Sequence, residues 1–322
     1  CSPDGRYLGV THAGTHELSL IDWPALIQKL ESPASANPST DLTFLKDLRV
    51  RIPLPGQGPR GLAFAGTKAV VTQYFSDDLA IVDPASQAKP IVKTVSLGEA
   101  AEPTLIRRGE ALFHDASIAF QGWQSCATCH PDARADGLNW DLLNDGLGNP
   151  KNTKSLLLSH QTPPVMSSGV RETAEEAVRS GMKHILFAVR PEAEYAAIDE
   201  YLKSLQPLPS PDLRDSQRKE AVRRGERLFH DLAVGCAACH SGPLYTDMNS
   251  YDVGTRGPLD KSGTFDTPHL IELWRTAPYL HDGGAATLCE VLTTHNAGDQ
   301  HGKTSHLSQE QIDDLEAFLM SL

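Results

Sequence analysis

The sequence predicts a mainly α-helical chain in which two tandem helical domains follow an N-terminal β segment. A helical pattern begins near residue 99, and its opening helix occurs twice. Arg107–Asp115 and Arg223–Asp231 both read Arg-Arg-Gly-Glu-x-Leu-Phe-His-Asp, and each precedes a Cys-x-x-Cys-His motif. Before residue 99, short apolar runs separated by Gly and Pro predict strands instead. We therefore expect a β segment at 1–98 and helical domains at 99–208 and 209–322.

The β segment contains two stretches with a similar order of strands and turns. The second stretch follows the first after about 60 residues, a period that is typical of propeller blades. The segment resembles the YVTN-type β-propeller. About two blades cannot close a ring of 4–8 blades, so either upstream blades are missing from this chain or the open edge packs elsewhere. Strands are expected at Tyr7–Thr11, Leu18–Asp22, Ala69–Gln73, Leu79–Val82 and Ile91–Val95.

Apolar stripes at helical spacing predict further helices after residue 170. One helix covers Ala174–Ile185, and another follows the start signal at Pro191. The last helix opens with the capping box Ser308-x-x-Gln311 and should pack against the first helix of its domain. The Pro-rich stretch Pro207–Pro211 is the expected linker between the two domains.

The repeated Cys-x-x-Cys-His motif is the attachment signature of a c-type haem. Two thiols form thioethers with the haem, and the histidine becomes the proximal iron ligand. A zinc ribbon would place its paired cysteines only about 15–20 residues apart, and a thioredoxin-like site would not need the histidines. We therefore expect two covalently bound haems on two cytochrome c-like domains, held by Cys126, Cys129 and His130 and by Cys236, Cys239 and His240.

Composition excludes several function classes. The chain has 322 residues, 40% of them hydrophobic and 22% charged, as in a soluble globular protein. A net charge of −12 argues against nucleic acid and anionic membranes as partners, and leaves room for a cationic redox partner. No run approaches the ~18–20 apolar residues of a membrane span. The two remaining cysteines, Cys1 and Cys289, could pair or stay free; we expect Cys1 to mark a truncated start rather than a lipidated cysteine.

Four further segments, together with the haem motifs, resemble the bacterial di-haem cytochrome c peroxidases. They are Leu112–Asp115, Lys151–Leu156, Arg275–Gly283 and Ala286–Leu288, and the resemblance covers roughly residues 104–322. The same superfamily includes the tryptophan-modifying di-haem enzyme of methylamine utilisation. The resemblance implies a Ca²⁺ ion, bound by the side chain of Asn152 and the backbone carbonyls of Thr276 and Pro278. Oxygen ligands of this kind suit a hard cation, although Asn152 could instead cap a turn.

The resemblance also implies a distal ligand for the C-terminal haem. At the spacing from Pro278 where the family has methionine or tyrosine, this chain has His295. Ligation by His240 and His295 would make this iron a weaker oxidant than methionine ligation would. The alternative is a surface histidine, because the same polar loop also contains His301 and His306.

The N-terminal haem lacks the distal groups that the family uses with peroxide. The family's Trp-Asp-Gly-Arg segment falls on 167–170, and its glutamine and glutamate fall on Ala177 and Phe187. Peroxide cleavage needs an open iron and groups that move protons. Glu175, Glu176 or His184 could substitute; alternatively a side chain closes the iron to peroxide, the candidates being His160, Met166 and His184. In a third alternative, His184 is only a satisfied surface histidine. Tryptophans available for electron relay are Trp123, Trp140 and Trp274.

Three functions follow from this reading. The first is a peroxidase-like enzyme, in which a small cytochrome c or cupredoxin reduces the C-terminal haem and hydrogen peroxide or a related oxidant reacts at the N-terminal haem. The second is a di-haem electron-transfer protein without peroxide chemistry. The third is an oxidase acting on a partner protein, by analogy alone. Because c-type haems are joined to their proteins outside the bacterial cytoplasm, we expect a periplasmic or otherwise exported protein.

Overall fold

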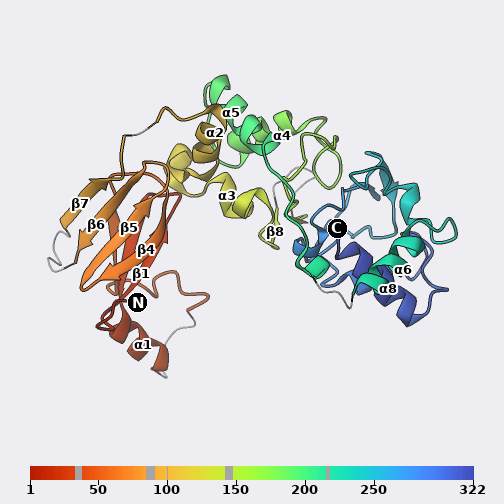
Figure 1. Cartoon of the computed structure of the whole chain (residues 1–322), viewed down its shortest axis with the longest axis horizontal. Coiled ribbons are helices and arrows are strands. Elements are labelled where there is room, and N and C mark those ends of the chain that lie inside the picture. The colour runs from red at the N-terminus through yellow and green to blue at the C-terminus, as the bar shows by residue number, and fades with distance from the viewer. Residues whose placement is uncertain (33–37, 85–90, 100, 142–147, 215–217) are drawn as a thin grey trace. The chain divides into compact units, whose positions relative to one another are not determined.

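The N-terminal part of the chain consists of two antiparallel β-sheets (Figure 1). The computed structural model describes residues 1–32, 38–84, 91–99, 101–141, 148–214 and 218–322. One sheet has the order β1-β2-β3, formed by Tyr7–His12, Glu17–Asp22 and Arg49–Pro53. The other has the order β4-β5-β6-β7, formed by Pro59–Ala65, Lys68–Gln73, Asp78–Asp83 and Ile91–Ser96. Strands that follow one another in sequence pair with one another, so each sheet is a meander.

The two sheets share one apolar core. Side chains alternate along each strand, and the inward positions of both sheets meet in one cluster. At Gly9 of β1 a Cβ atom would lie 2.6 Å from Leu62 of β4, which shows how closely the sheets approach. The predicted strands are confirmed, and propeller blades stay a prediction. The buried cluster contains Leu18, Leu20, Ile52, Leu54, Ala69, Val71, Ala80 and Val82.

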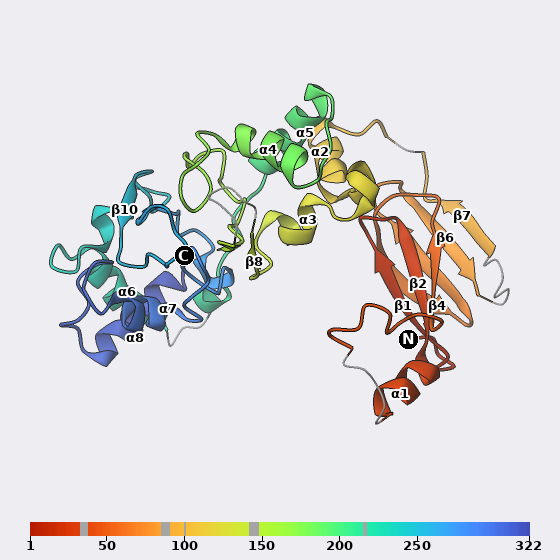
Figure 2. The same ribbon diagram turned by 180° about the vertical axis from the view of Figure 1, so that it is seen from behind.

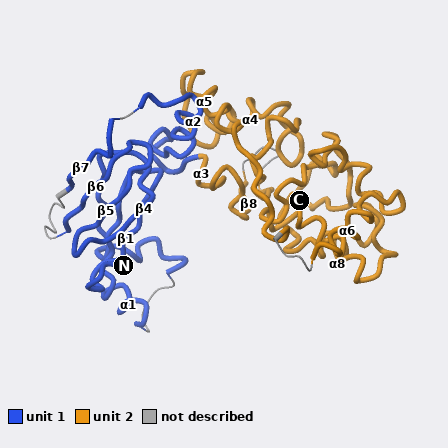
Figure 3. The backbone as a smooth tube through the Cα atoms, viewed as in Figure 1, with its two compact units in different colours: residues 1–125 blue, residues 126–322 orange. Residues whose placement is uncertain are grey.

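Helix α2 (Leu105–His114) packs against these sheets, which moves the predicted domain boundary. The guanidinium carbon of Arg107 lies 4.0 Å from the centre of the Tyr74 ring, and the same side chain donates to the Tyr74 carbonyl. After the helix, Ala116 N–H donates to the Gly14 carbonyl at 2.9 Å. The first compact unit spans residues 1–125 and includes this helix, whereas the sequence placed the helix after a boundary at residue 98 (Figure 3).

The second unit, residues 126–322, contains most of the helices (Figure 2). The predicted helices are present, although the structure as a whole is 31% helical with 18% strand, so "mainly α" overstates the helical share. The helices of this unit are α3 Cys126–Cys129, α4 Ala174–His184, α5 Glu192–Lys203, α6 Lys219–Phe229, α7 Leu288–Leu292 and α8 Gln309–Leu319. Its short strands are β8 Asn139–Trp140, β9 Lys151–Asn152, β10 Ser250–Asp252 and β11 Thr264–Asp266.

The remaining elements are short. In the first unit, α1 (Trp23–Glu31) follows β2 and was not expected from the sequence. Among the described residues, no helix has both the length and the apolar character that a membrane crossing requires. Single turns of 3-10 helix lie at Ala116–Ile118, Phe120–Gly122, Pro131–Ala133, Pro211–Arg214, Cys236–Ala238, Leu273–Arg275 and Thr294–Asn296.

Helices α6 and α8 lie side by side and form the core of the C-terminal part (Figures 1 and 2). The predicted capping box is confirmed at α8, where Ser308 and Gln311 each bond the other's backbone N–H. Phe229 of α6 and Phe318 of α8 have ring centres 5.1 Å apart inside the shared cluster. At Gly225 a Cβ atom would lie 1.9 Å from the Asp314 carbonyl oxygen, so only glycine allows this helix approach.

A turn and a helix start occur twice in the second unit, which extends the repeat seen in the sequence. Val165 bridges Arg171 in the first copy, and Tyr279 bridges Ala285 in the second. Each turn is followed by a helix whose N-cap threonine accepts a hydrogen bond from the glutamate three residues later, at Thr173 and Thr287. The two halves of the unit therefore repeat the same local structure around each haem motif.

A buried ion pair joins these halves. The guanidinium of Arg134 binds both carboxylate oxygens of Glu272, at 2.7 and 2.9 Å. Glu272 is only 1% exposed, and it also accepts the Leu208 N–H from the Pro-rich linker at 2.6 Å. Burial raises the pKa of Glu272, but the hydrogen bonds from Arg134 and Leu208 outweigh that effect and hold the pKa below its ordinary value.

A matched pair of glycine substitutions should change stability in opposite directions. Gly225→Ala is expected to cost about 1–3 kcal/mol or more, because the added methyl group meets backbone atoms of α8. Gly181→Ala in α4 meets no atom within 4 Å and should gain about 0.5–1 kcal/mol of helix stability. Urea unfolding of the haem-loaded protein, followed by circular dichroism, measures both. Equal effects of the two substitutions would contradict the close packing of α6 on α8.

Removing the charge of Glu272 should destabilise the protein strongly. Glu272→Gln leaves Arg134 buried without its counter-charge, which costs about 3–5 kcal/mol in comparable cases. The exposed pair Arg223–Glu220 provides the control, since Glu220→Gln should cost about 0–1 kcal/mol. Because the Glu272 pKa is lowered, its contribution is fully present above the ordinary glutamate pKa and is lost as pH falls through the lowered pKa of the folded state. The loss of unfolding free energy should therefore be larger for Glu272→Gln than for Glu220→Gln at pH 7, and the two losses should become similar in acid. Equal losses at pH 7 would argue against the Arg134–Glu272 pair.

Candidate haem-binding sites

The first Cys-x-x-Cys-His motif forms a single helical turn. Cys126–Cys129 is helix α3, and the His130 N–H donates to the Cys126 carbonyl at 3.0 Å. One turn therefore carries both thiols and the imidazole. This is the local arrangement that covalent attachment requires, because both thioethers and the proximal ligand must reach one haem.

The second motif has the same turn. The His240 N–H donates to the Cys236 carbonyl, again at 3.0 Å. Gly235, in the left-handed conformation with φ of 83°, leads the chain into this turn. Burial raises the pKa of the Cys126 thiol to about 12 and that of the Cys236 thiol to about 11, because the sites are shielded from water. Neither Cys1 nor Cys289, for which the sequence left pairing open, forms a disulfide.

Both proximal histidines have the tautomer that suits an iron ligand. Nδ1 of His130 lies 3.0 Å from the Arg134 carbonyl, and Nδ1 of His240 lies 3.0 Å from the Tyr245 carbonyl. A carbonyl can only accept, so each Nδ1 carries the proton and Nε2 presents its lone pair. Burial also lowers the pKa of both imidazoles, which keeps them neutral. The residues present at both sites therefore fit c-type haems.

A histidine that the sequence did not select lies opposite His240. The ring centres of His240 and His301 are 6.2 Å apart, with 38° between their planes. Burial lowers the pKa of His301 to about 4, so this imidazole is neutral as well. The loop that carries His301 also approaches the attachment turn, since Lys303 N–H donates to the Val234 carbonyl at 2.8 Å.

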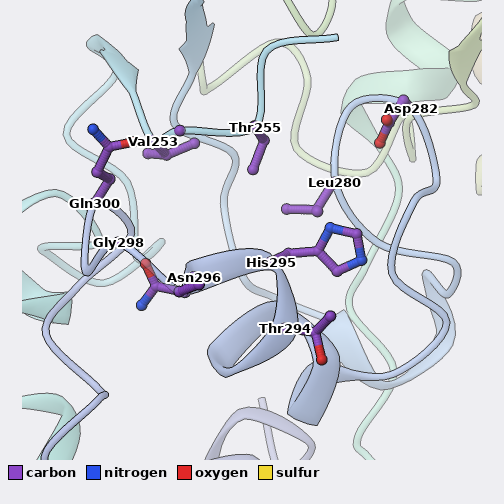
Figure 4. A pocket seen from close by; sticks show the side chains of 11 residues that line it. Val253, Thr255, Leu280, Asp282, Thr294, His295, Asn296, Gly298 and Gln300 are labelled. Atoms are coloured by element: carbon purple, nitrogen blue, oxygen red, sulfur yellow. The ribbon is translucent and has the colours of Figure 1, made fainter.

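His295, the predicted distal ligand, lies on the wall of a pocket (Figure 4). The pocket has a volume of about 270 Å³, and Thr255, Leu280 and Asp282 are among the residues that line it. His295 belongs to the short turn Thr294–Asn296 and is half-buried. Within the described residues it makes no ring contact with His240.

The residues proposed to close the first iron are not equally available. Nε2 of His160 lies 3.1 Å from Asp199 Oδ1, and its Nδ1 lies 3.4 Å from the Ser159 hydroxyl. Asp199 also receives Arg179 at 2.8 Å, so His160 belongs to a buried charged network. Met166 lies at the bend of the repeated turn with φ of 73°. His184 is exposed near the end of α4.

The two acidic candidates lie in the first turn of α4. Glu175 forms an ion pair with Lys203 at 3.3 Å. Burial raises its pKa, but hydrogen bonds, including that from Lys203, outweigh this and lower the pKa below its ordinary value. Glu176 accepts the Glu172 N–H at 3.1 Å and so closes the helix start. Both carboxylates therefore have structural partners, and neither is set apart for proton transfer by its contacts.

Of the three expected calcium ligands, Asn152 and Pro278 lie in contact with each other. The side-chain amide of Asn152 donates to the Pro278 carbonyl, and its Oδ1 is buried without a hydrogen-bond partner among the described residues. The Asn152 N–H donates to the His281 carbonyl at 2.8 Å, which fixes the strand to the repeated turn. Thr276 lies just before this turn, where its hydroxyl donates to the Leu273 carbonyl. An unpartnered buried oxygen beside a carbonyl fits a hard cation.

The three tryptophans have different surroundings. Trp140 donates to Asp136 at 2.9 Å, whereas Trp123 is about half exposed, at 52%. The indole nitrogen of Trp274 is buried and has no hydrogen-bond partner within the described part of the chain. Near it in sequence, His269 donates from Nε2 to the Leu157 carbonyl at 2.8 Å while its Nδ1 stays unpartnered there. The sequence offered no spacing rule that would have selected His269.

Comparisons with known proteins agree with two haems on one chain. No family model matches the chain. Over 273 residues it is 32% identical to hydrazine synthase subunit gamma of Kuenenia stuttgartiensis, covering 68% of this chain and 77% of that one. It is 25% identical over 284 residues to the methylamine utilization protein MauG of Methylorubrum extorquens, covering 68% of this chain and 78% of that one. Further relatives are named cytochrome c peroxidases.

Among solved structures, hydrazine synthase of Kuenenia stuttgartiensis matches with a TM-score of 0.67 and 27% identity. That match covers 72% of this chain and 99% of the solved one. Members of this group carry two c-type haems, as the two attachment turns require. The chain therefore belongs to the superfamily of di-haem cytochrome c peroxidases and MauG proteins.

Proposed function

We propose that this di-haem oxidoreductase takes electrons at the site of Cys236–His240 and delivers them to a small oxidant, such as hydrogen peroxide, at the site of Cys126–His130. Bound haem supplies one-electron chemistry at both sites. Reduction of one peroxide to two waters consumes two electrons and two protons, so two one-electron centres match the reaction. Charge recognition supports a small cationic donor of the cytochrome c or cupredoxin type, because the chain carries a net charge of −12.

One observation carries this proposal: both ring nitrogens of His160 already have hydrogen-bond partners. Its two nitrogens bind Asp199 and Ser159, and Asp199 is further held by Arg179. Ligation of iron through His160 Nε2 would break the bond to Asp199 and leave a buried carboxylate short of a partner, which is costly, and ligation through Nδ1 would displace the Ser159 hydroxyl. The side of the first haem away from His130 is therefore proposed to stay open to a small oxidant.

His184 is the proposed proton-transfer group at this site. Glu175 and Glu176 are occupied by Lys203 and by the α4 start, respectively. In the part of the chain that the structure describes, the His184 side chain forms no hydrogen bond, and an imidazole can both accept and donate a proton. We also place the protein outside the bacterial cytoplasm, where c-type haems are attached.

Spectroscopy and turnover together test the proposal. The oxidised haem-loaded protein should show one high-spin ferric signal in electron paramagnetic resonance, because one iron is open. It should bind cyanide at one haem and consume peroxide when a reduced small cytochrome c is supplied. Two low-spin signals with no peroxide consumption would overturn the proposal in favour of an electron-transfer protein.

Substitution of His184 tests the proton-transfer role. His184→Ala should lower peroxide turnover by about 10²-fold or more, while haem content and the spectrum of the resting protein stay unchanged. His306→Ala, another exposed histidine, serves as the control and should leave turnover unchanged. An equal loss in both variants, or no loss in either, would exclude His184 from this role.

We further propose that Asn152 Oδ1 and the Pro278 carbonyl, joined by the Thr276 carbonyl, bind Ca²⁺. The support is the buried Asn152 oxygen that lacks a partner in the described residues, and its position beside Pro278. In the structure the Asn152 amide nitrogen faces the carbonyl. Because amide oxygen and nitrogen are assigned from the hydrogen-bond network, a bound cation would favour the opposite orientation.

Removal of Ca²⁺ by a chelator and substitution of Asn152 should both leave the protein without bound calcium. The purified haem protein should retain about one equivalent of calcium by elemental analysis. EGTA treatment should lower its thermal midpoint, and added Ca²⁺ should restore it. Asn152→Ala should abolish both the calcium content and the response to EGTA, whereas Asn249→Ala, at an exposed position, should keep both. Calcium retained in the Asn152 variant would place the ion elsewhere.

A further inference from the structure

We infer that His301 is the second axial ligand of the C-terminal haem, in the role that the sequence assigned to His295. This inference deepens the proposed function, because it defines the site that holds the incoming electron. It rests on the haem-attachment turn at Cys236–His240 and on the loop that carries His301. It does not depend on which oxidant reacts at the other haem.

The separation of the two imidazoles supports this assignment. A metal–imidazole bond is about 2.0 Å long, and a ring nitrogen lies about 1.1 Å from the ring centre, so two imidazoles across one ion have centres roughly 6.2 Å apart. The centres of His240 and His301 are 6.2 Å apart. Stacked rings would be closer, as Phe265 and His281 are at 3.8 Å. The observed distance therefore matches the separation that two imidazoles bound to one iron would have.

A buried asparagine fixes the loop that carries His301. Asn296 is 4% exposed, and its Oδ1 accepts the His301 N–H at 2.8 Å. Its Nδ2 donates to the carbonyls of His301 and Gly302 and to the Thr304 hydroxyl, at 2.9–3.1 Å. Thr304 in turn donates to the Leu292 carbonyl at 2.6 Å, at the end of α7. The backbone of His301 is thus held on both sides by one side chain.

The same loop lies against the haem-attachment turn. A Cβ atom at Gly302 would lie 3.3 Å from the Val234 carbonyl and 3.8 Å from Cys236 Sγ. The Lys303 N–H donates to that Val234 carbonyl. Because Cys236 is a point of covalent attachment, the residue next to Gly302 is necessarily close to the macrocycle.

The orientation of His295 differs from that of its neighbour. Consecutive side chains on a 3-10 turn point about 120° apart. Asn296 points into the loop it organises, and His295 points away from it, toward Leu280 in the pocket (Figure 4). The His295 side chain therefore lines the pocket, while His301 is the histidine that lies across from His240.

Two imidazoles on one iron have a chemical consequence. A six-coordinate site is closed to exogenous ligands, and imidazole gives a lower reduction potential than methionine in the same position. The C-terminal haem would then hold and pass on an electron without binding the oxidant. This division of roles matches the proposed direction of electron flow.

Electron paramagnetic resonance of three haem-loaded variants tests the inference. His301→Ala should convert the low-spin signal of the C-terminal haem into a high-spin signal and add one cyanide-binding site. His301→Met should remain low-spin, raise the reduction potential of this haem and show the charge-transfer band of methionine ligation. His295→Ala, the matched control, should leave the spectrum and the potential unchanged.

The opposite pattern would overturn the assignment. If His295→Ala removes the low-spin signal and His301→Ala does not, His295 is the ligand. If His301→Ala fails to fold, the methionine variant decides, because an unchanged spectrum and potential there would exclude residue 301 as a ligand. Absence of peroxide turnover in the wild-type protein would reject the proposed function while these spectral shifts still held, so the two failures are distinguishable.

Discussion

The buried pair between Arg134 and Glu272 links the two haem-bearing halves of the second unit, and much of that unit depends on it. Arg134 acts twice: its carbonyl accepts the His130 Nδ1 proton, and its guanidinium binds the Glu272 carboxylate. Glu272 in turn holds the linker at Leu208, and its own N–H binds the carbonyl of the last residue, Leu322. The orientation of the His130 imidazole is thereby coupled to the packing of the C-terminal half. Weakening the Arg134–Glu272 contact would disturb both.

The two haem sites have the same proximal side and different distal sides. Both imidazoles donate from Nδ1 to a backbone carbonyl, so the difference between them cannot come from the attachment turns. It comes from the loops that follow the repeated turn. After Thr287 the chain forms the short helix α7 and returns through the Asn296 loop to place His301 opposite His240. After Thr173 it continues through the longer helix α4, which carries His184 to its exposed end.

Local sequence signals predicted local structure well. The capping box at Ser308 was readable because it depends on a few neighbouring residues. Counting along the chain gives less information about which residue of a loop reaches a site. The count from Pro278 selects His295 and passes over His301, since spacing says nothing about which way a residue in a loop points. Similarly, the pattern assigned α2 to the helical part, but Arg107 and Ala116 attach it to the β-sheets through residues distant in sequence.

By itself, the sequence determined the cofactor and the duplication, because Cys-x-x-Cys-His places two thiols and an imidazole on one turn regardless of the surrounding fold. It also determined the longer helices α2, α4, α5, α6 and α8, whose apolar periodicity and caps are local, whereas α1 was not expected. Only the tertiary structure decided which histidine lies opposite His240, that His160 is held by Asp199, and that Arg134 meets Glu272. These are contacts between residues brought together by chain folding, and their geometry depends on buried hydrogen bonds such as those of Asn296, which no spacing along the chain encodes.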